Sequence, residues 1–104
     1  MTSSDSIESW SDKIKPLADR AFELAVARWE RDAPLDEAAI AEARQKQAEL
    51  RGLAKELKEN HPHIYKRFSD LISEALLDYK YALNAPPATS LRLHHYIEDH
   101  ERKS

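Results

Sequence analysis

The sequence predicts an all-α protein, an antiparallel helical bundle of three main helices plus a short C-terminal helix. Apolar residues recur at steps of three and four along most of the chain, which is the spacing of one face of an α-helix. Charged residues make up 34% of the 104 residues and there is one glycine, a composition that favours long helices over a sheet. Prolines separate the periodic runs from one another. We expect a single domain over residues 1–104, with main helices at about 11–31, 35–59 and 62–84 and the short helix at about 90–101.

The first main helix is expected to follow a short N-terminal turn or helix. Residues 1–5 should be flexible, and Asp5 followed by Glu8 resembles only a weak helix cap. Pro16 interrupts the regular apolar steps at the start of the chain. Because a proline inside a helix costs about 3 kcal/mol, we expect the main helix to begin near residues 11–16.

This first helix carries more apolar surface than packing against one helical hairpin requires. Its apolar residues form two adjacent strips: Leu17, Ala21 and Leu24 in one, and Ala18, Phe22, Ala25, Val26 and Trp29 in the other. A helix packed on a hairpin needs an apolar stripe only about 100° wide. We therefore expect a second subunit to cover the second strip, and a different protein as the partner is the alternative.

Residues 35–84 are expected to form a helical hairpin that turns at residues 60–62. Asn60 is a favourable N-cap for the second helix of the hairpin, with Pro62 in its first turn. A turn this short makes the two helices antiparallel neighbours. One register then pairs apolar positions along the whole hairpin: Leu57 with Ile64 or Tyr65, Leu53 with Phe68, Leu50 with Ile72, Ala43 with Tyr79, and Ile40 with Ala82.

The same register brings rows of opposite charge together. Asp70, Glu74 and Asp78 form an acidic row at helical spacing, and Arg44, Arg51 and Lys55 form a basic row on the facing helix. We expect Arg51 to pair with Asp70 and Arg44 to pair with Asp78. An acidic row also suggests a metal site, but neutralisation by the facing basic row is the simpler interpretation.

Residues at the element boundaries give further expectations. Asp32 or Asp36 should cap the first helix of the hairpin, and Thr89 or Ser90 should cap the last helix. The region 88–104 is thus a C-terminal helix or tail. Gly52 lies inside a predicted helix, where it allows a close helix approach, marks a bend or breaks the helix.

Composition excludes several classes of function. The net charge is −3 with the two signs interleaved, which argues against a phosphate-binding protein. The chain has no cysteine, so it has neither a thiolate nucleophile nor a cysteine zinc site, and a cytoplasmic location is expected. No apolar run is long enough for a membrane span, and the polar start does not resemble a signal peptide.

Histidines in the last helix are candidate metal ligands. His94 with Glu98, and His95 with Asp99, are pairs separated by one helical turn, a spacing that suits two ligands of a divalent transition metal. Two ligands are too few for a complete site, and no His-Glu-x-x-His motif is present. An exposed helix that happens to carry histidines is the structural alternative.

The expected function is a non-enzymatic protein–protein interaction module, a small regulator, inhibitor or accessory subunit acting through apolar helix faces. Neither a nucleophile-elbow motif nor a glycine-rich phosphate loop is present, so we expect no enzyme and no cofactor other than the metal considered above. Partners would be an unidentified protein and, in a homodimer, a second copy. The candidate contact residues are Trp10, Phe22, Val26, Trp29, Tyr81 and Tyr96.

A weaker alternative is nucleic-acid binding through basic residues of the first hairpin helix. The row would consist of Arg44, Arg51, Lys55 and Lys58. This hypothesis predicts binding that weakens steeply with salt, and it fails if the row is already paired with the facing helix.

Overall fold

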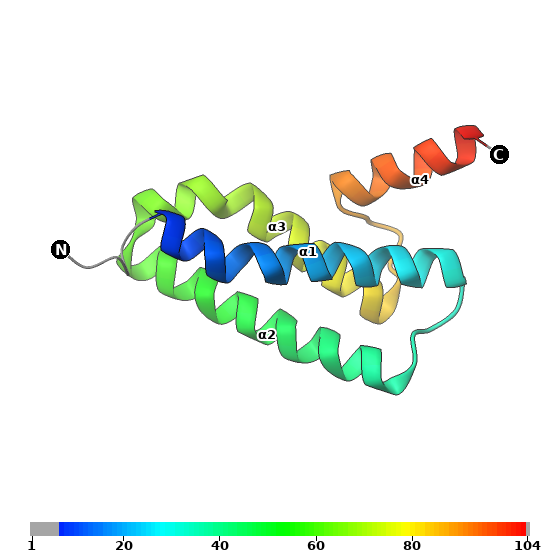
Figure 1. Cartoon of the computed structure of the whole chain (residues 1–104), viewed down its shortest axis with the longest axis horizontal. Coiled ribbons are helices and arrows are strands. Elements are labelled where there is room, and N and C mark those ends of the chain that lie inside the picture. Colours follow the sequence, from blue (N-terminus) through cyan, green and yellow to red (C-terminus); the bar gives the residue numbers. More distant parts are fainter. Residues whose placement is uncertain (1–6, 104) are drawn as a thin grey trace.

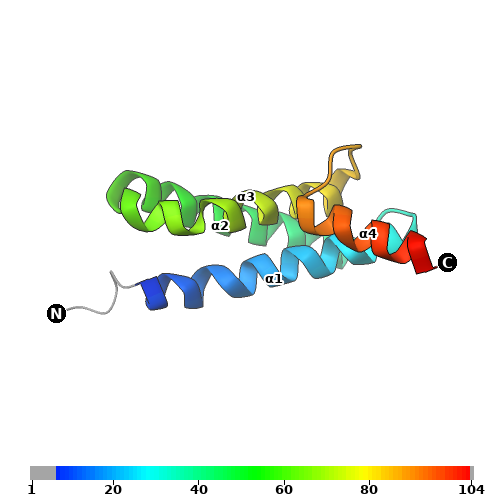
Figure 2. The same cartoon turned by 90° about the horizontal axis from the view of Figure 1, so that it is seen from above.

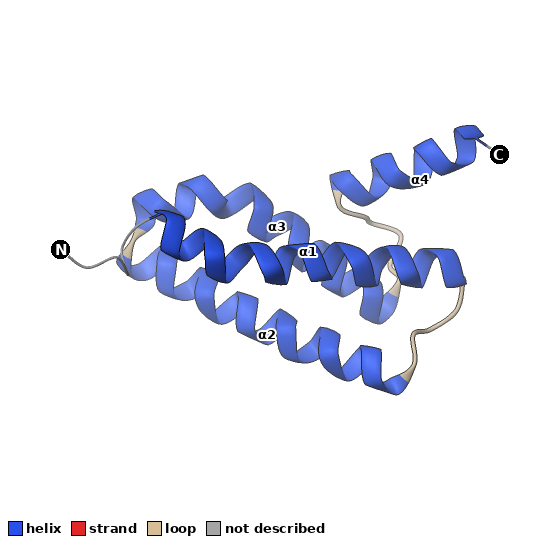
Figure 3. Ribbon diagram, viewed as in Figure 1, coloured by secondary structure: helices blue, strands red, loops and turns tan. Residues whose placement is uncertain are grey.

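The computed structural model describes residues 7–103, which form four helices without any strand (Figure 3). The helices are α1 (Ile7–Arg31), α2 (Glu37–Asn60), α3 (Pro62–Asn84) and α4 (Leu91–Lys103). The predicted all-α class, with three main helices and a short last one, is confirmed. The expected flexibility of residues 1–5 and the cap at Asp5 lie outside the described residues.

The three main helices form an up–down–up bundle (Figure 1). α2 and α3 are antiparallel neighbours in one layer, and α1 lies across that layer and contacts both (Figure 2). α4 lies outside the bundle, at the end where α1 and α3 finish, and it contacts only these two helices (Figure 1).

The hydrophobic core lies between α1, α2 and α3. Every apolar residue that the predicted hairpin register pairs belongs to this core or is packed against it. Leu50 and Ile72, at the middle of the hairpin, are 0% and 2% exposed. The antiparallel hairpin was thus predicted correctly, and its apolar face is covered by α1.

α1 begins earlier than predicted and continues through Pro16 without a break. The proline side chain faces solvent, so its ring does not disturb the core. Trp10 and Ile14, which precede it, are 2% and 0% exposed. Burial of a large apolar side chain contributes about 1.5–3 kcal/mol, so two such side chains offset the backbone hydrogen bond that the proline lacks.

The hairpin turns within residues 60–62, as predicted, but the residue that caps α3 differs from the predicted one. Asn60 is the last residue of α2, and His61 is the interrupting residue, so the prediction of Asn60 as the N-cap of α3 was wrong. The cause is Pro62, which disfavours a helical conformation at the residue immediately before it. The His61 N–H closes α2 on the Leu57 carbonyl at 2.7 Å, and the His61 carbonyl accepts the first hydrogen bonds of α3.

Two other boundary residues behave differently from each other. Asp36 caps α2, since its carboxylate accepts a hydrogen bond from the Ala39 N–H at 2.8 Å. Asp32 instead terminates α1 in a left-handed conformation with φ 51°, which aspartate tolerates better than most residues.

Gly52 lies within an unbroken α2, and a Cβ at this position would have no neighbour within 4 Å. It therefore serves neither a break nor a close helix approach.

Candidate protein-binding surface

Two of the three residues of the acidic row of α3, Glu74 and Asp78, bind the start of α4 and not α2, which corrects the predicted pairing. Asp78 is 0% exposed, and its carboxylate accepts hydrogen bonds from the Ser90 hydroxyl and from Arg92 Nε, the latter at 2.7 Å. Arg44 and Arg51 are exposed and form no ion pair with α3 within residues 7–103. The prediction failed because the register of the hairpin fixes which residues face α2, but it does not show what approaches α3 from outside.

The N-terminus of α4 is bound to α3 through its backbone. The Glu74 carboxylate accepts the N–H groups of Leu91 and Arg92 at 3.0 and 2.9 Å, and Ser90 Oγ accepts the Leu93 N–H at 3.1 Å. The first N–H groups of a helix have no partner within the helix, and the positive end of its dipole attracts carboxylates. Ser90 is thus the cap, one of the two residues predicted for this role.

Arg92 joins three helices at this point. Its guanidinium reaches from Asp78 on α3 to the Ala18 carbonyl on α1, at 2.6 Å from Nη2, and it lies 5.1 Å from the centre of the Phe22 ring. Burial raises the pKa of Asp78 above its ordinary range, while the hydrogen bonds from Ser90 and Arg92 oppose this rise. Within the described residues, the buried carboxylate therefore takes its two hydrogen-bond partners from α4 and from the N-cap of that helix, Ser90.

α4 also packs on part of α1 through Tyr96. We call the α1 residues Phe22, Val26 and Trp29 the α1 strip. The Tyr96 ring lies edge-on to both Phe22 and Trp29, with ring centres 5.9 Å apart in each case. Its hydroxyl donates to Glu30 at 2.9 Å, and its partial burial together with this carboxylate raises the pKa of Tyr96. Of the strip that was expected to meet a second subunit, Ala18 and Ala25 are thus buried, and Phe22 and Trp29 contact the chain's own last helix.

This covering is shallow. The hydrophobic core cluster contains no α4 residue, and Leu93 is the single buried apolar side chain of α4. Phe22, Val26, Trp29 and Tyr96 all keep part of their surface in solvent. Leu91, at the start of α4, is 63% exposed and is one of the two large exposed hydrophobic residues within residues 7–103. α4 is thus fixed at its N-terminus by polar contacts and is held weakly along its length.

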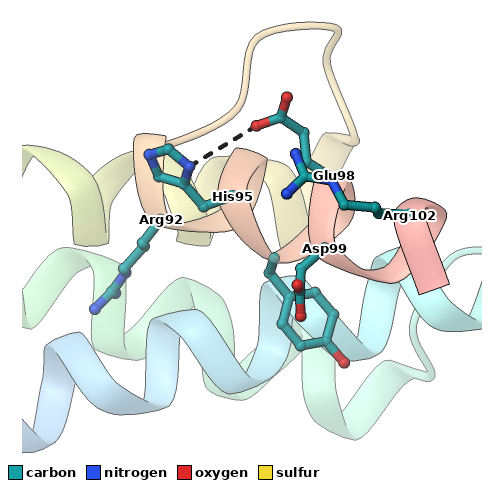
Figure 4. A pocket seen from close by; sticks show the side chains of 6 residues that line it. Arg92, His95, Glu98, Asp99 and Arg102 are labelled. Carbon is teal, nitrogen blue, oxygen red and sulfur yellow. Dashed lines mark ion pairs between the residues drawn. The ribbon is translucent and has the colours of Figure 1, made fainter.

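The outward side of α4 carries the predicted metal ligands. A shallow depression of about 420 Å³ is lined by Arg92, His95, Tyr96, Glu98, Asp99 and Arg102 (Figure 4). Glu98 lies 3.4 Å from His94 and 3.8 Å from His95, whereas Asp99 pairs with Lys103 at 3.2 Å. Within the described residues no group of three or more histidine or carboxylate side chains is arranged to hold a metal ion. Metal binding by these residues stays a prediction, which elemental analysis and zinc titration of a His94→Ala/His95→Ala variant would test.

The other predicted contact residues are not gathered at this surface. Trp10 lies in the core at the opposite end of α1, with its ring centre 5.8 Å from that of His61 and with Lys13 over its face. Tyr81 is half-buried on α3. The structure therefore brings together Phe22, Trp29 and Tyr96 but separates them from Trp10.

Sequence reasoning missed the polar anchor of α4 although one signal was present. Asp78 falls on the apolar face of its helix, between Ala75 and Ala82, and a charged residue at a buried helix position requires a partner. The link between α1 and α2 was also missed. There Arg20 makes two hydrogen bonds to Glu42, at 2.6 and 2.9 Å, and lowers the pKa of that carboxyl.

Two further findings bear on function. No described helix is both long and apolar enough to cross a membrane. Comparison of the chain with protein-family models, curated proteins and solved structures finds no match.

Proposed function

We propose that the protein is a non-enzymatic protein–protein interaction module, a small regulator, inhibitor or accessory subunit whose binding surface is the α1 strip together with α4. The observation that carries this proposal is the aromatic cluster of Phe22, Trp29 and Tyr96. Each of these rings keeps part of its surface in solvent, and α4, which contributes Tyr96, has one buried apolar residue.

The arrangement supports recognition of a helix in a groove. In this mode an amphipathic helix places residues from successive turns on an apolar surface, and aromatic side chains contribute most of the affinity. α4 already binds to the bundle in this manner. Leu93 is buried, Tyr96 lies on the α1 strip, and the ring centre of His100 lies 5.6 Å from that of Trp29. The cytoplasm remains the expected location for this activity.

Affinity capture from the native host, using the whole chain as bait, tests the proposal. Val26→Glu places a charge in the α1 strip, and Trp29→Ala removes its largest ring. We expect each variant to bind the captured partner at least about tenfold more weakly than the unmodified chain, because a well-packed aromatic contact contributes 2 kcal/mol or more.

Lys58→Glu is the matched control, since Lys58 is exposed near the turn between α2 and α3, at the other end of the bundle. It should bind the partner as the unmodified chain does. The helical content of all variants is compared by circular dichroism. Equal affinity of the partner for the control and for both folded strip variants would show that the interaction surface lies elsewhere.

A further inference from the structure

The connection between α3 and α4 holds one residue in an unfavourable conformation. Ala85 has φ 45° and ψ 52°, the left-handed region, and Pro86 follows it. Alanine loses about 1 kcal/mol in this region, and a residue before proline prefers an extended backbone. The chain adopts this conformation where it reverses to place α4 beside α3.

The surface beneath α4 carries hydrogen-bond acceptors and apolar side chains that match the groups at the start of that helix. We call it the α4 receptor: the carboxylates of Glu74 and Asp78, the Ala18 carbonyl and the α1 strip. Asp78 has no exposed surface, and a buried carboxylate without a partner destabilises a protein strongly. The receptor therefore needs an occupant that supplies a serine cap, an arginine two residues later and an aromatic ring one turn further on.

We propose that two copies of this chain exchange α4, so that each copy's Ser90–Arg92 segment and Tyr96 occupy the α4 receptor of the other copy. This inference rests on the proposed function and names a second copy as the partner. Every contact between α4 and the receptor is preserved in the exchanged dimer. Ala85 becomes able to extend, because the chain no longer has to reverse.

The length of the connection sets when exchange occurs. Ser90 must lie beside Asp78, six residues before the end of α3. At 1.5 Å per residue along the helix and about 8–10 Å between packed helices, the gap to be spanned is about 13 Å. The segment 85–90 reaches about 20 Å when extended. The closed monomer is thus accessible, and exchange is expected as the protein concentration approaches the roughly millimolar effective concentration of a short tether.

A pair of charge-reversed full-length chains tests exchange directly. Asp78→Lys places a second cation against Arg92 when α4 stays on its own chain, and Arg92→Glu places a carboxylate against Asp78. When the two variants are mixed, exchange pairs each helix with a receptor of opposite charge in both halves of the dimer. We expect each variant alone to be monomeric by native mass spectrometry and light scattering, and the equimolar mixture to form a heterodimer of twice the mass. Two folded variants that stay monomeric when mixed would overturn the proposal.

Hinge variants give a second test that leaves the buried site intact, in case Asp78→Lys does not fold. Deleting residues 86–88 leaves a connection of about 10 Å, shorter than the gap of about 13 Å, so the closed monomer is prevented. We expect this variant to be dimeric at concentrations where the unmodified chain is monomeric. A monomer at every concentration would overturn the proposal.

Substitution of the strained residue should act in the opposite direction. Ala85→Gly relieves the left-handed strain in the closed monomer, since glycine adopts this conformation without loss. We expect the dissociation constant of the exchanged dimer to rise about 30-fold, which corresponds to about 1 kcal/mol at each of two hinges. An unchanged or lower dissociation constant would contradict the proposal.

These results are separable from the test of the proposed function. If exchange fails while Trp29→Ala still loses its host partner, the surface binds another protein without exchanging α4. If the heterodimer forms while host capture is unaffected by the strip variants, exchange of α4 stands and the proposed recognition of other proteins fails.

Discussion

Tyr79 shows how one buried hydroxyl joins α3 to α1. The residue is 0% exposed, and its hydroxyl donates to the Leu17 carbonyl at 2.5 Å. Burial raises the pKa of Tyr79, so the donor stays protonated at neutral pH. Tyr79→Phe keeps the ring and removes the donor, and we expect the unfolding free energy measured in urea to fall by about 1–2 kcal/mol.

Tyr65→Phe is the matched control for this prediction. Tyr65 packs against the same core, and its hydroxyl has no hydrogen-bond partner within residues 7–103. The expected change in unfolding free energy is below about 0.5 kcal/mol. Equal losses in the two variants would mean that the Tyr79 hydroxyl contributes nothing beyond its ring.

The raised pKa of Asp78 predicts a pH dependence of stability. A carboxyl whose pKa is higher in the folded protein than the ordinary value of 3.8 binds its proton more readily when folded. Its contribution to the unfolding free energy therefore decreases as the pH rises from about 3.8 through the folded pKa. We expect the stability of the unmodified chain relative to Asp78→Asn to fall over this range, as measured by urea unfolding at a series of pH values.

Glu42→Gln should show the opposite sign. Arg20 lowers the pKa of Glu42 below its ordinary value of 4.5, so this carboxylate stabilises the fold above that pH and loses its effect as the pH falls through the folded pKa. The stability of the unmodified chain relative to Glu42→Gln should therefore rise with pH. If the stability of the unmodified chain relative to Asp78→Asn also rose with pH, the ion pair with Arg92 would have a larger effect on the pKa of Asp78 than burial has.

At the scale of elements, α2 tolerates an unfavourable residue that can be replaced. Gly52 is exposed in the helix interior, and an added Cβ meets nothing within 4 Å. We expect Gly52→Ala to raise the unfolding free energy by about 1 kcal/mol, since alanine loses less backbone entropy than glycine in a helix. Ala48→Gly, at another exposed position of α2, should lower it by a similar amount. A loss of stability in Gly52→Ala would reveal a constraint at this position that the packing does not show.

The hairpin of α2 and α3 could be predicted from sequence because its signals agree. Apolar spacing, the proline at the turn and the pairing of apolar positions all indicate a hairpin, and Leu50 of α2 and Ile72 of α3 are buried in the same core. The start of α1 could not be predicted, because the local cost of Pro16 is offset by burial of Trp10 and Ile14, which depends on the assembled bundle. Local penalties are weak guides where a helix is fixed by its tertiary contacts.

At the scale of the whole molecule, the candidate surface was only half predictable. Phe22, Val26 and Trp29 were predicted as contact residues because the first helix carries surplus apolar surface, and Tyr96 was predicted as an exposed aromatic contact. Their coverage by α4 was not predicted, since the charges that fix α4 lie outside the hairpin register. The sequence predicted Arg44 as the partner of Asp78, whereas the folded chain pairs Asp78 with Arg92.

Within residues 7–103, α1, α2 and α3 form the core and α4 lies outside it, so we expect α4 to open separately from the core, and hydrogen exchange can test this. α4 has 13 residues, and a helix of this length is marginal in water without tertiary contacts. In native-state exchange, we expect the α4 amides to open at a free energy well below that of global unfolding, while core amides of α1 and α3 exchange only by global unfolding.

Ser90→Ala removes the cap and one partner of Asp78, so it should lower the opening free energy of α4 by about 1–2 kcal/mol and leave the core amides nearly unchanged. Thr89→Ala, next to the cap, is the control and should change neither the opening free energy of α4 nor the exchange of the core amides. If the α4 amides were as protected as those of the core, α4 would not open separately.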